Sequence, residues 1–511
     1  MELQLIRERI RMEQPLGVGQ AEALVTGEVT LPGGLREETH VLVAQASATV
    51  ERAEAAQGRI NVRGRTMFHV LYTQGEPAKV HAIEASADFV QPVELAGVQP
   101  RNAAHARLQV NRVEARATGG RLSLRAEVGV QAQAASQEPV EAITAIEGAD
   151  DVQVRTASQT IMRTVASGSA DELLREEIAL PEGLGITETL FAEAYPVVEA
   201  VTGGLGRVGL SGQVLLEAVH ASGLPGRPVV VTRHSIPFAQ SVEITGEDGE
   251  RLSGTAVVRD VAVASQDDGE GVSMRAEVLL GLEAHADVEE TTDLLQDAYT
   301  IRGEDLRLQG ETFLCRTGGA VHTAAESGKA TLLLPDSAPP VRTVLAAFAR
   351  PLPDKHEAQG DRTMLTGRLD VTLLYTTDGT EAPVSVRLTE PFSISFPVEV
   401  PDDALLSLAV TGAEASPITS DRVELRYILR LQLQGNAVSR IRLLVDGQTT
   451  PGGMQTEDIV LCYVQPGETL WDVARRYHTP VESVRALNPG VKGDVMPGQG
   501  VVVWNRNAQA Q

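Results

Sequence analysis

The sequence predicts a mainly β fold, with three tandem antiparallel β repeat domains of about 150 residues each, followed by a small βααβ module. An alternating strand occurs three times, around Arg125, Arg275 and Arg426, and these arginines are separated by 150 and 151 residues. Asp-Gly and Gly-Gly turns are frequent before residue 445, and helical periodicity there is short. Helix capping signals gather after residue 459. The fold class follows from these observations together.

The repeated strand also predicts which side chains are buried. It spans 121–128, 271–278 and 422–429, and its apolar residues alternate with Arg, Glu and Ser. Period-2 alternation is typical of a strand with one face in the core and one in water. The three arginines should therefore be at least partly exposed. The apolar side chains expected in the core are Leu122, Leu124, Val272, Met274, Val423 and Leu425.

Other landmarks keep the same register. Gly64, Gly212 and Gly367 each precede a strand and then a turn, and the turn glycine follows after 11, 11 and 12 residues. The repeats should therefore occupy 1–145, 146–298 and 299–445. The opening segment of each copy could instead pair with the preceding copy, and that alternative would move the boundaries.

Residues 446–458 have the composition of a linker, with Asp446-Gly447 and a run of Thr, Pro and Gly. The βααβ module should follow at 459–505. Thr469 and Asp472 are expected to cap its first helix, whose apolar positions fall at i, i+3, i+4 and i+7 from Leu470. A second capping box is expected at 479–482, with proline at the first helical position.

Composition excludes several classes of function. Forty-four basic and sixty-nine acidic residues give a net charge of −25, which opposes binding to nucleic acids and anionic membranes. The first ten residues carry charges where a signal peptide needs an apolar run, and no 18-residue apolar segment is present for membrane insertion. The two cysteines lie in different modules. We therefore expect a protein of the reducing cytoplasm.

No catalytic or metal site is expected. The glycine pattern at 204–209 is followed by a strand in place of the helix that dinucleotide binding requires, so turn glycines are favoured. The ten histidines have no metal-ligand spacing, and neither cysteine has a histidine partner in its own strand core. Acidic pairs at 37–38, 289–290 and 402–403 could serve glycan cleavage, but solvated loop charge is favoured. We expect no enzyme activity, cofactor or metal.

The C-terminal module resembles a LysM domain through 463–471, Leu487-Asn488-Pro489 and Pro497-Gly498-Gln499. The resemblance implies a shallow groove for N-acetylglucosamine polymers, between the loop before the first helix and the loop after the second. The groove positions it implies are Gly467, Glu468, Thr469, Leu470, Asn488, Pro489, Gly490 and Val491. Glu468 could bind ligand or serve helix electrostatics. Trp471 could stack on a sugar or pack on the module surface.

The repeats together with the terminal module resemble the SPOCS (DUF3794) family of spore-coat morphogenetic proteins. The strands that carry the resemblance lie at 58–72 and 121–130 and at the corresponding places of the other copies. The family implies a non-enzymatic adaptor in the mother-cell cytoplasm, gathered at the forespore surface through the coat basement ATPase SpoIVA, with LysM binding that protein partner. The alternative is an exported cell-wall protein whose LysM domain binds peptidoglycan. A wall hydrolase lacks a catalytic constellation.

Overall fold

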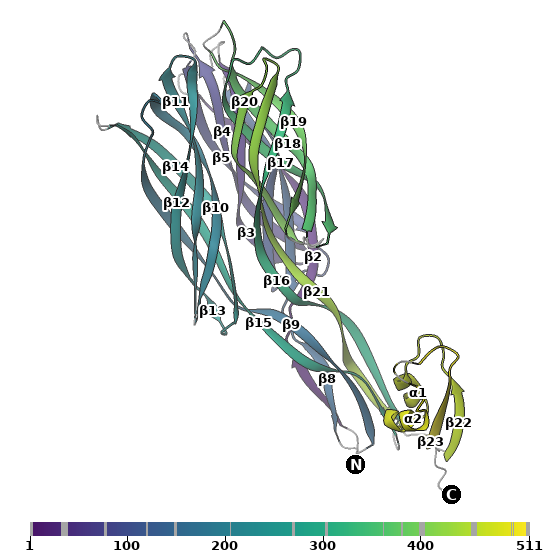
Figure 1. The fold of residues 1–511 in the computed structure, drawn as a ribbon. Coiled ribbons are helices and arrows are strands. Elements are labelled where there is room, and N and C mark those ends of the chain that lie inside the picture. Colours follow the sequence, from purple (N-terminus) through teal and green to yellow (C-terminus); the bar gives the residue numbers. More distant parts are fainter. Residues whose placement is uncertain are drawn as a thin grey trace.

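The computed structural model of the protein describes residues 4–31, 39–75, 79–118, 121–147, 151–204, 206–267, 271–301, 305–360, 362–379, 382–397, 404–450, 457–491, 493 and 495–506. Its sheets are antiparallel, and two short helices lie near the C-terminus, so the mainly β prediction is confirmed. Figure 1 shows an elongated molecule: packed sheets fill one end, and long ribbons run from them toward the small module.

The strands before the module fall into three units, which we define by their buried cores. The first unit has two three-stranded sheets, β2-β7-β6 and β3-β4-β5, and a short β1-β8 ribbon. Its strands are β1 (Gln4–Ile10), β2 (Gln14–Val29), β3 (His40–Ala56), β4 (Arg59–Gln74), β5 (Lys79–Glu94), β6 (Ala103–Thr118), β7 (Arg121–Ser136) and β8 (Val140–Glu147).

The second and third units also consist of two sheets each, with longer opening and closing strands. The second has sheets β13-β9-β15-β14 and β10-β11-β12, and the third has β16-β21-β20 and β17-β18-β19. The strands of the second are β9 (Val152–Ala179), β10 (Ile186–Gly204), β11 (Arg207–Leu224), β12 (Arg227–Glu243), β13 (Thr245–Gly246), β14 (Arg251–Asp267) and β15 (Val272–Thr300). Those of the third are β16 (Asp305–Leu333), β17 (Thr343–Gln359), β18 (Arg362–Thr376), β19 (Val384–Phe396), β20 (Leu405–Pro417) and β21 (Arg422–Thr450).

The opening strand of each unit pairs with the closing strand of the same unit. β1 pairs with β8, β9 with β15, and β16 with β21 along their whole length. In the first unit the closing strand is interrupted at 137–139, because Pro139 has no N–H to donate to a ladder. In the other two units it runs unbroken for 29 residues. Opening segments therefore do not pair with the preceding unit.

The linker expected at 446–458 needs correction, because β21 continues to Thr450 and β22 (Glu457–Tyr463) begins at Glu457. Asp446-Gly447 is part of a ladder, with Gly447 opposite Leu308, and is not a turn. A Cβ at Gly447 would lie 2.8 Å from methyl carbons of Leu308 and Leu5, so glycine lets ribbons of two units approach closely. Residues 451–456 lie outside the described residues.

The predicted strand faces are confirmed at five of the six apolar positions. Leu122, Leu124, Met274, Val423 and Leu425 are at most 1% exposed. The prediction is wrong for Val272, which is only half-buried because it is the first residue of β15, at the end of its sheet. The side chains of Arg125, Arg275 and Arg426 are at least half exposed, and each pairs with a glutamate two residues away on its own strand.

The three units meet one another through apolar clusters. One joins the β3–β5, β10–β12 and β17–β18 strands, with Leu71, Val219 and Leu374 fully buried in it. Two smaller clusters join the three ribbons, around Leu294, Ile441 and Cys315 and around Ile143, Leu295 and Leu444. Each cluster contains residues from all three units. The body is therefore one packed assembly.

A buried ionic network lies where the ribbons leave the sheets. We call it the waist network; it comprises Arg316 of the third unit, Glu13 of the first, and Asp287 and Thr164 of the second. The Arg316 guanidinium donates to Asp287 Oδ2 at 2.6 Å, to Thr164 Oγ1 at 2.9 Å and to Glu13 Oε2 at 3.2 Å. Burial opposes the charge of Arg316, but the two carboxylates outweigh it and raise the pKa of the guanidinium.

Within the described part of the chain, no helix has the length and apolar character needed to cross a membrane.

Candidate functional site

The C-terminal module has its own small core. β22 pairs with β23 (Gly500–Arg506), and the helices α1 (Leu470–Arg476) and α2 (Val481–Leu487) cover one face of this two-stranded sheet. Val473, Ala474 and Val484 of the helices pack on Val501 and Val503 of the sheet. The βααβ order predicted from the sequence is thus present.

The expected cap of α1 is confirmed. Thr469 is the N-cap: its hydroxyl accepts the Asp472 N–H, and the Asp472 carboxylate accepts the Thr469 N–H at 2.8 Å. Burial would raise the pKa of Asp472, but the hydrogen bonds from Thr469 hold it below its usual range. The acidic residue therefore stays charged at the positive end of the helix.

The capping box expected at 479–482 is wrong. Pro480 is the N-cap of α2, and no side chain caps this helix. Thr479 is 1% exposed, and its carbonyl accepts the hydroxyl of Tyr299 in the second unit at 2.8 Å. Contact with the body thus fixes this turn, which the local pattern could not indicate.

The groove positions implied by the LysM resemblance divide into exposed and structural ones. Gly467, Thr469, Pro489 and Gly490 are exposed, and Glu468 and Val491 are half-buried. Leu470 is 7% exposed and belongs to the module core, so its side chain is not on the groove surface. The two loops thus offer mainly backbone, small side chains and Pro489 to a ligand.

Two polar groove positions have structural contacts. The Glu468 carboxylate accepts the Gln465 N–H at 2.8 Å and forms an ion pair with Arg476. The Asn488 side chain donates to the carbonyls of Val484 and Val502 and accepts the Val502 N–H at 2.8 Å. Asn488 therefore ties the end of α2 to β23, which fixes the position of the second groove loop.

One face of α1 is docked on the ribbon of the second unit. The centre of this contact is Asp297 of β15, whose side chain is 7% exposed. Its Oδ2 accepts the Trp471 indole N–H at 2.8 Å and an Arg475 N–H at 2.8 Å. Because Trp471 and Arg475 are four residues apart, they project from the same helix face.

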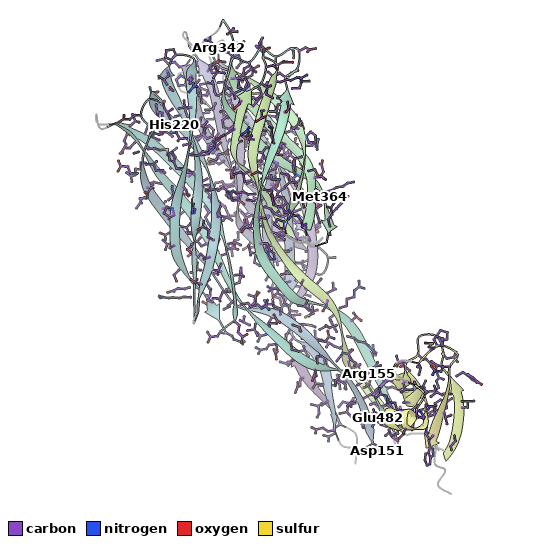
Figure 2. All side chains as sticks on the ribbon, viewed as in Figure 1. Asp151, Arg155, His220, Arg342, Met364 and Glu482 are labelled. Carbon is purple, nitrogen blue, oxygen red and sulfur yellow. The ribbon has the colours of Figure 1, made fainter. Side chains whose placement is uncertain are left out.

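Three neighbouring contacts complete what we call the LysM dock, comprising Trp471, Arg475 and His478 of the module and Asp297, Tyr299, Thr300 and Arg155 of the ribbon. The Tyr299 ring lies edge-on to Trp471, with centroids 5.0 Å apart. Arg155 lies over the indole at 5.3 Å, and Figure 2 shows it at the end of the ribbon, beside the module. His478 Nδ1 lies 2.9 Å from the Thr300 carbonyl oxygen. Trp471 therefore packs on the body, a role that the sequence did not indicate.

Sequence reasoning missed the ribbon side of the dock. Asp297 lies 174 residues before Trp471, so no local pattern connects them. The one sequence signal was a carboxylate among the apolar residues Leu294, Leu295, Ala298 and Tyr299. Burial raises the pKa of Tyr299, so its hydroxyl keeps the proton that it donates to Thr479.

The other candidate residues lie in several parts of the body and the module. The glycines at 204–209 flank the hairpin between β10 and β11, where Gly206 has φ +78°. Cys315 and Cys462 are buried and free, and burial raises the pKa of the Cys315 thiol to about 11. Among the described residues no group of three His, Cys, Asp or Glu has metal-site geometry. Glu289 forms an ion pair with Arg251; the acidic pairs at 37–38 and 402–403 lie outside the described residues.

Comparison with known families gives two matches. The model described as the SPOCS domain of SipL matches residues 39–118, which hold β3 to β6 of the first unit, and the LysM domain model matches residues 462–504. Neither the curated proteins nor the solved structures contain a match.

By its fold and the two matches, this is a mainly β protein in which residues 39–118 are similar to a SPOCS domain and residues 462–504 to a LysM domain, both non-catalytic domain families. The combination of the two is SipL-like. The two similarities fit a sporulation coat-related protein, and the LysM match fits binding of N-acetylglucosamine polymers.

Proposed function

We propose that the protein is a non-enzymatic adaptor in spore-coat assembly. The observation that carries this proposal is the combination of a fixed module with exposed loops. The LysM dock holds α1 on the body through Asp297, while Gly467, Thr469, Pro489 and Gly490 remain exposed in the full chain. An adaptor must hold one partner at a set distance and angle from another, and a docked module does so.

The body would present the second binding surface. In this proposal the three units are copies of one SPOCS-like β repeat, at 1–145, 146–298 and 299–445, with the closing ribbons extended to Glu147, Thr300 and Thr450. Support comes from the corresponding pairs of sheets in the three units and from the matching places of Arg125, Arg275 and Arg426 on β7, β15 and β21. Coat proteins would bind this body.

The LysM loops would bind the basement-layer ATPase, a SpoIVA-like protein, at the outer surface of the forespore. The protein would then lie in the mother-cell cytoplasm. Support comes from the SipL SPOCS match together with the LysM match. A C-terminal fluorescent fusion followed through sporulation should form a shell around the forespore; a fusion spread over the cell envelope would contradict this location.

The alternative function is binding of peptidoglycan through the same loops. Backbone groups and small side chains around Gly467 and Gly490 suit the hydroxyl and acetamido groups of an N-acetylglucosamine polymer. The two functions share a site and differ in ligand. A binding experiment with both ligands therefore separates them.

The experiment compares capture of the full chain by purified SpoIVA-like ATPase and by insoluble peptidoglycan. Gly490 has no atom within 4 Å of the position of an added Cβ and no left-handed φ, so Gly490→Trp should fill the groove without unfolding the module. Gly204→Trp is the matched control, since that glycine has the same open surroundings in the body. We expect ATPase capture to fall at least tenfold, on the order of a lost hot spot, for Gly490→Trp alone.

Deletion of residues 457–511 should also abolish ATPase capture and leave the body folded, because every strand of the three units ends by Thr450. Undiminished ATPase capture by the truncated chain would place the contact on the body.

Loss of peptidoglycan binding in Gly490→Trp, with ATPase capture unchanged, would favour the alternative function. Zymography should show no clearing of peptidoglycan by the full chain.

A further inference from the structure

The LysM sheet has one covered face and one bare face. On the covered face, Cys462, Val501 and Val503 are at most 5% exposed and pack under the helices. On the opposite face, Ile459, Leu461 and Tyr463 occupy alternate positions of β22 and are 70%, 57% and 59% exposed. Their cross-strand partners are Trp504, Val502 and Gly500. Large apolar side chains exposed in a continuous row mark an interaction surface.

We propose that this face, which we call the bare sheet face (Ile459, Leu461, Tyr463, Gly500, Val502 and Trp504), binds the same face of a second copy of the chain. The protein would then be a dimer joined through its LysM domains. This inference goes beyond the adaptor function, because it concerns the sheet and leaves the groove loops to other ligands.

The body does not cover this face. The LysM dock uses Trp471, Arg475 and His478, which belong to α1 and to the turn after it, whereas the bare face lies across the sheet from the helices. At the centre of the face, Ile459 and Leu461 have no group that hydrogen-bonds to a sugar hydroxyl; only Tyr463 and Trp504, at its ends, have one. The apolar centre therefore favours a protein surface over a glycan.

The charge distribution favours a second copy. Residues 457–506 contain six acidic and five basic residues, so nearly all of the net charge of −25 lies on residues 1–456. Two bodies that approached each other would bring like charges together. The LysM domain is almost neutral and lies at the far end of the elongated molecule, away from the packed sheets (Figure 1). Contact through it joins two chains while their bodies remain apart.

The shape of the face is also self-complementary. Leu461 lies at the middle of the row, with Ile459 on one side and Tyr463 on the other. Gly500, opposite Tyr463, has no side chain, and the nearest atoms to a Cβ placed there are those of Leu461 and Tyr463, at 3.4 and 3.7 Å. A two-fold axis that runs parallel to the strands, midway between β22 and β23, would let Tyr463 of each copy lie over Gly500 of the other and Leu461 over Val502. Such isologous contacts are the commonest in symmetric dimers.

The test is the mass of the full chain by sedimentation equilibrium over roughly 1 to 100 μM, the range in which weak specific dimers dissociate. We expect a concentration-dependent dimer. The double variant Ile459→Thr with Leu461→Thr should weaken it more than about tenfold, because the central contacts carry most of the binding energy. Threonine is a good strand former, so the sheet should persist. The matched control is Leu333→Thr, equally exposed at 61% but on the body.

Salt gives a second readout. Because the contact is apolar, the LysM domain is almost neutral and the bodies remain apart, raising salt from about 0.1 M to about 1 M should not weaken the dimer. A chain that stays monomeric throughout would overturn the proposal and assign the bare sheet face to a different protein. A dimer that survives the double variant, while near-ultraviolet circular dichroism shows an intact fold, would also overturn it, because the copies would then meet elsewhere.

Discussion

The waist network and the LysM dock both join segments distant in sequence through a buried aspartate and an arginine, but they differ in exposure. At the waist, the side chains of Arg316 and Asp287 are 9% and 5% exposed. At the dock, Asp297 is as deeply buried at 7%, yet Arg475 is 40% exposed. The waist also continues into apolar clusters from all three units, whereas the dock joins the module to one ribbon through polar contacts and one buried aromatic residue, Tyr299, which packs in the module core.

The difference indicates which joint is permanent. Removing one member of a fully buried ion pair leaves an uncompensated charge, while a half-exposed arginine can return to water. The waist should therefore hold until the body unfolds. The dock should open separately and at lower cost, so a substitution can release the LysM domain without unfolding the body.

The largest effect is expected for Arg316→Ala, which leaves Glu13 and Asp287 buried without their cation. We expect a loss of about 3–5 kcal/mol in the free energy of unfolding, measured by chemical denaturation. Arg275→Ala is the control, because that side chain is 52% exposed and should cost less than about 1 kcal/mol. Equal losses for the two variants would show that the waist network does not join the units.

Substitutions in the apolar cores give a loss of unfolding free energy with which the loss in Arg316→Ala can be compared. Leu124→Ala and Leu425→Ala remove side chains that are 1% and 0% exposed, each in the core of one unit, and should cost about 2–5 kcal/mol. Leu24→Ala, at a position 56% exposed, should change the melting temperature little. Unchanged thermal denaturation in both core variants would mean that the strand faces are wrongly assigned.

Acid should weaken the body through His220, which is fully buried between Thr189 and Thr232. Burial lowers the pKa of His220 from 6.5 to about 4. Between pH 6.5 and about 4 the unfolded chain therefore binds more protons at this histidine than the folded chain does. The stability that the neutral His220 contributes is complete above pH 6.5, and the free energy of unfolding should fall by about 1–3 kcal/mol as the pH is lowered to about 4.

His220→Asn should flatten that part of the stability profile in chemical denaturation at stepped pH. The emission of Trp471 in the LysM dock, recorded over the same pH range, serves as the control and should not follow His220, because His220 belongs to β11 in the second unit. An unchanged slope would show that another group carries the pH dependence.

The dock should open in Asp297→Asn, because Arg475 loses its charged partner while the body keeps its packing. A hydrogen bond to a charged group contributes about 1.5–3 kcal/mol, and the exposure of Arg475 reduces that to roughly 1–2 kcal/mol. The chain has two tryptophans, so in a Trp504→Phe background the emission reports Trp471 alone and should shift to longer wavelength. The control is Asp293→Asn, exposed on the same ribbon. No shift would mean that the aromatic pair alone holds the dock.

The smallest effect on stability is expected for Glu468→Ala, which removes an ion pair with Arg476 at the module surface. We expect less than about 1 kcal/mol in the unfolding of the full chain. Binding to the groove should nevertheless change, because the Gln465 N–H loses its acceptor and the first loop is less constrained. A melting curve lowered by several degrees would assign Glu468 to the fold and not to the groove.

Much of the local structure could be predicted because it depends on neighbours in sequence. Period-2 alternation identified the buried faces of β7, β15 and β21, and the Thr469-Asp472 pair identified the start of α1. The LysM and SPOCS resemblances rested on similar short stretches, and the family matches at 462–504 and 39–118 agree with them. The two local predictions that failed concern residues at the ends of elements: Val272 begins β15, and Thr479 precedes α2 and is held by Tyr299 of the body.

What the tertiary structure alone decided is where the pieces meet. Gly447 looked like a turn residue, but the approach of Leu308 and Leu5 places it in a ribbon. Trp471 looked like a sugar platform or a surface residue, but Asp297, 174 residues earlier, holds it on the body. Alternation and capping are set within a few residues by backbone geometry, whereas contacts between units depend on the shapes and charges of surfaces that exist only after each unit has folded.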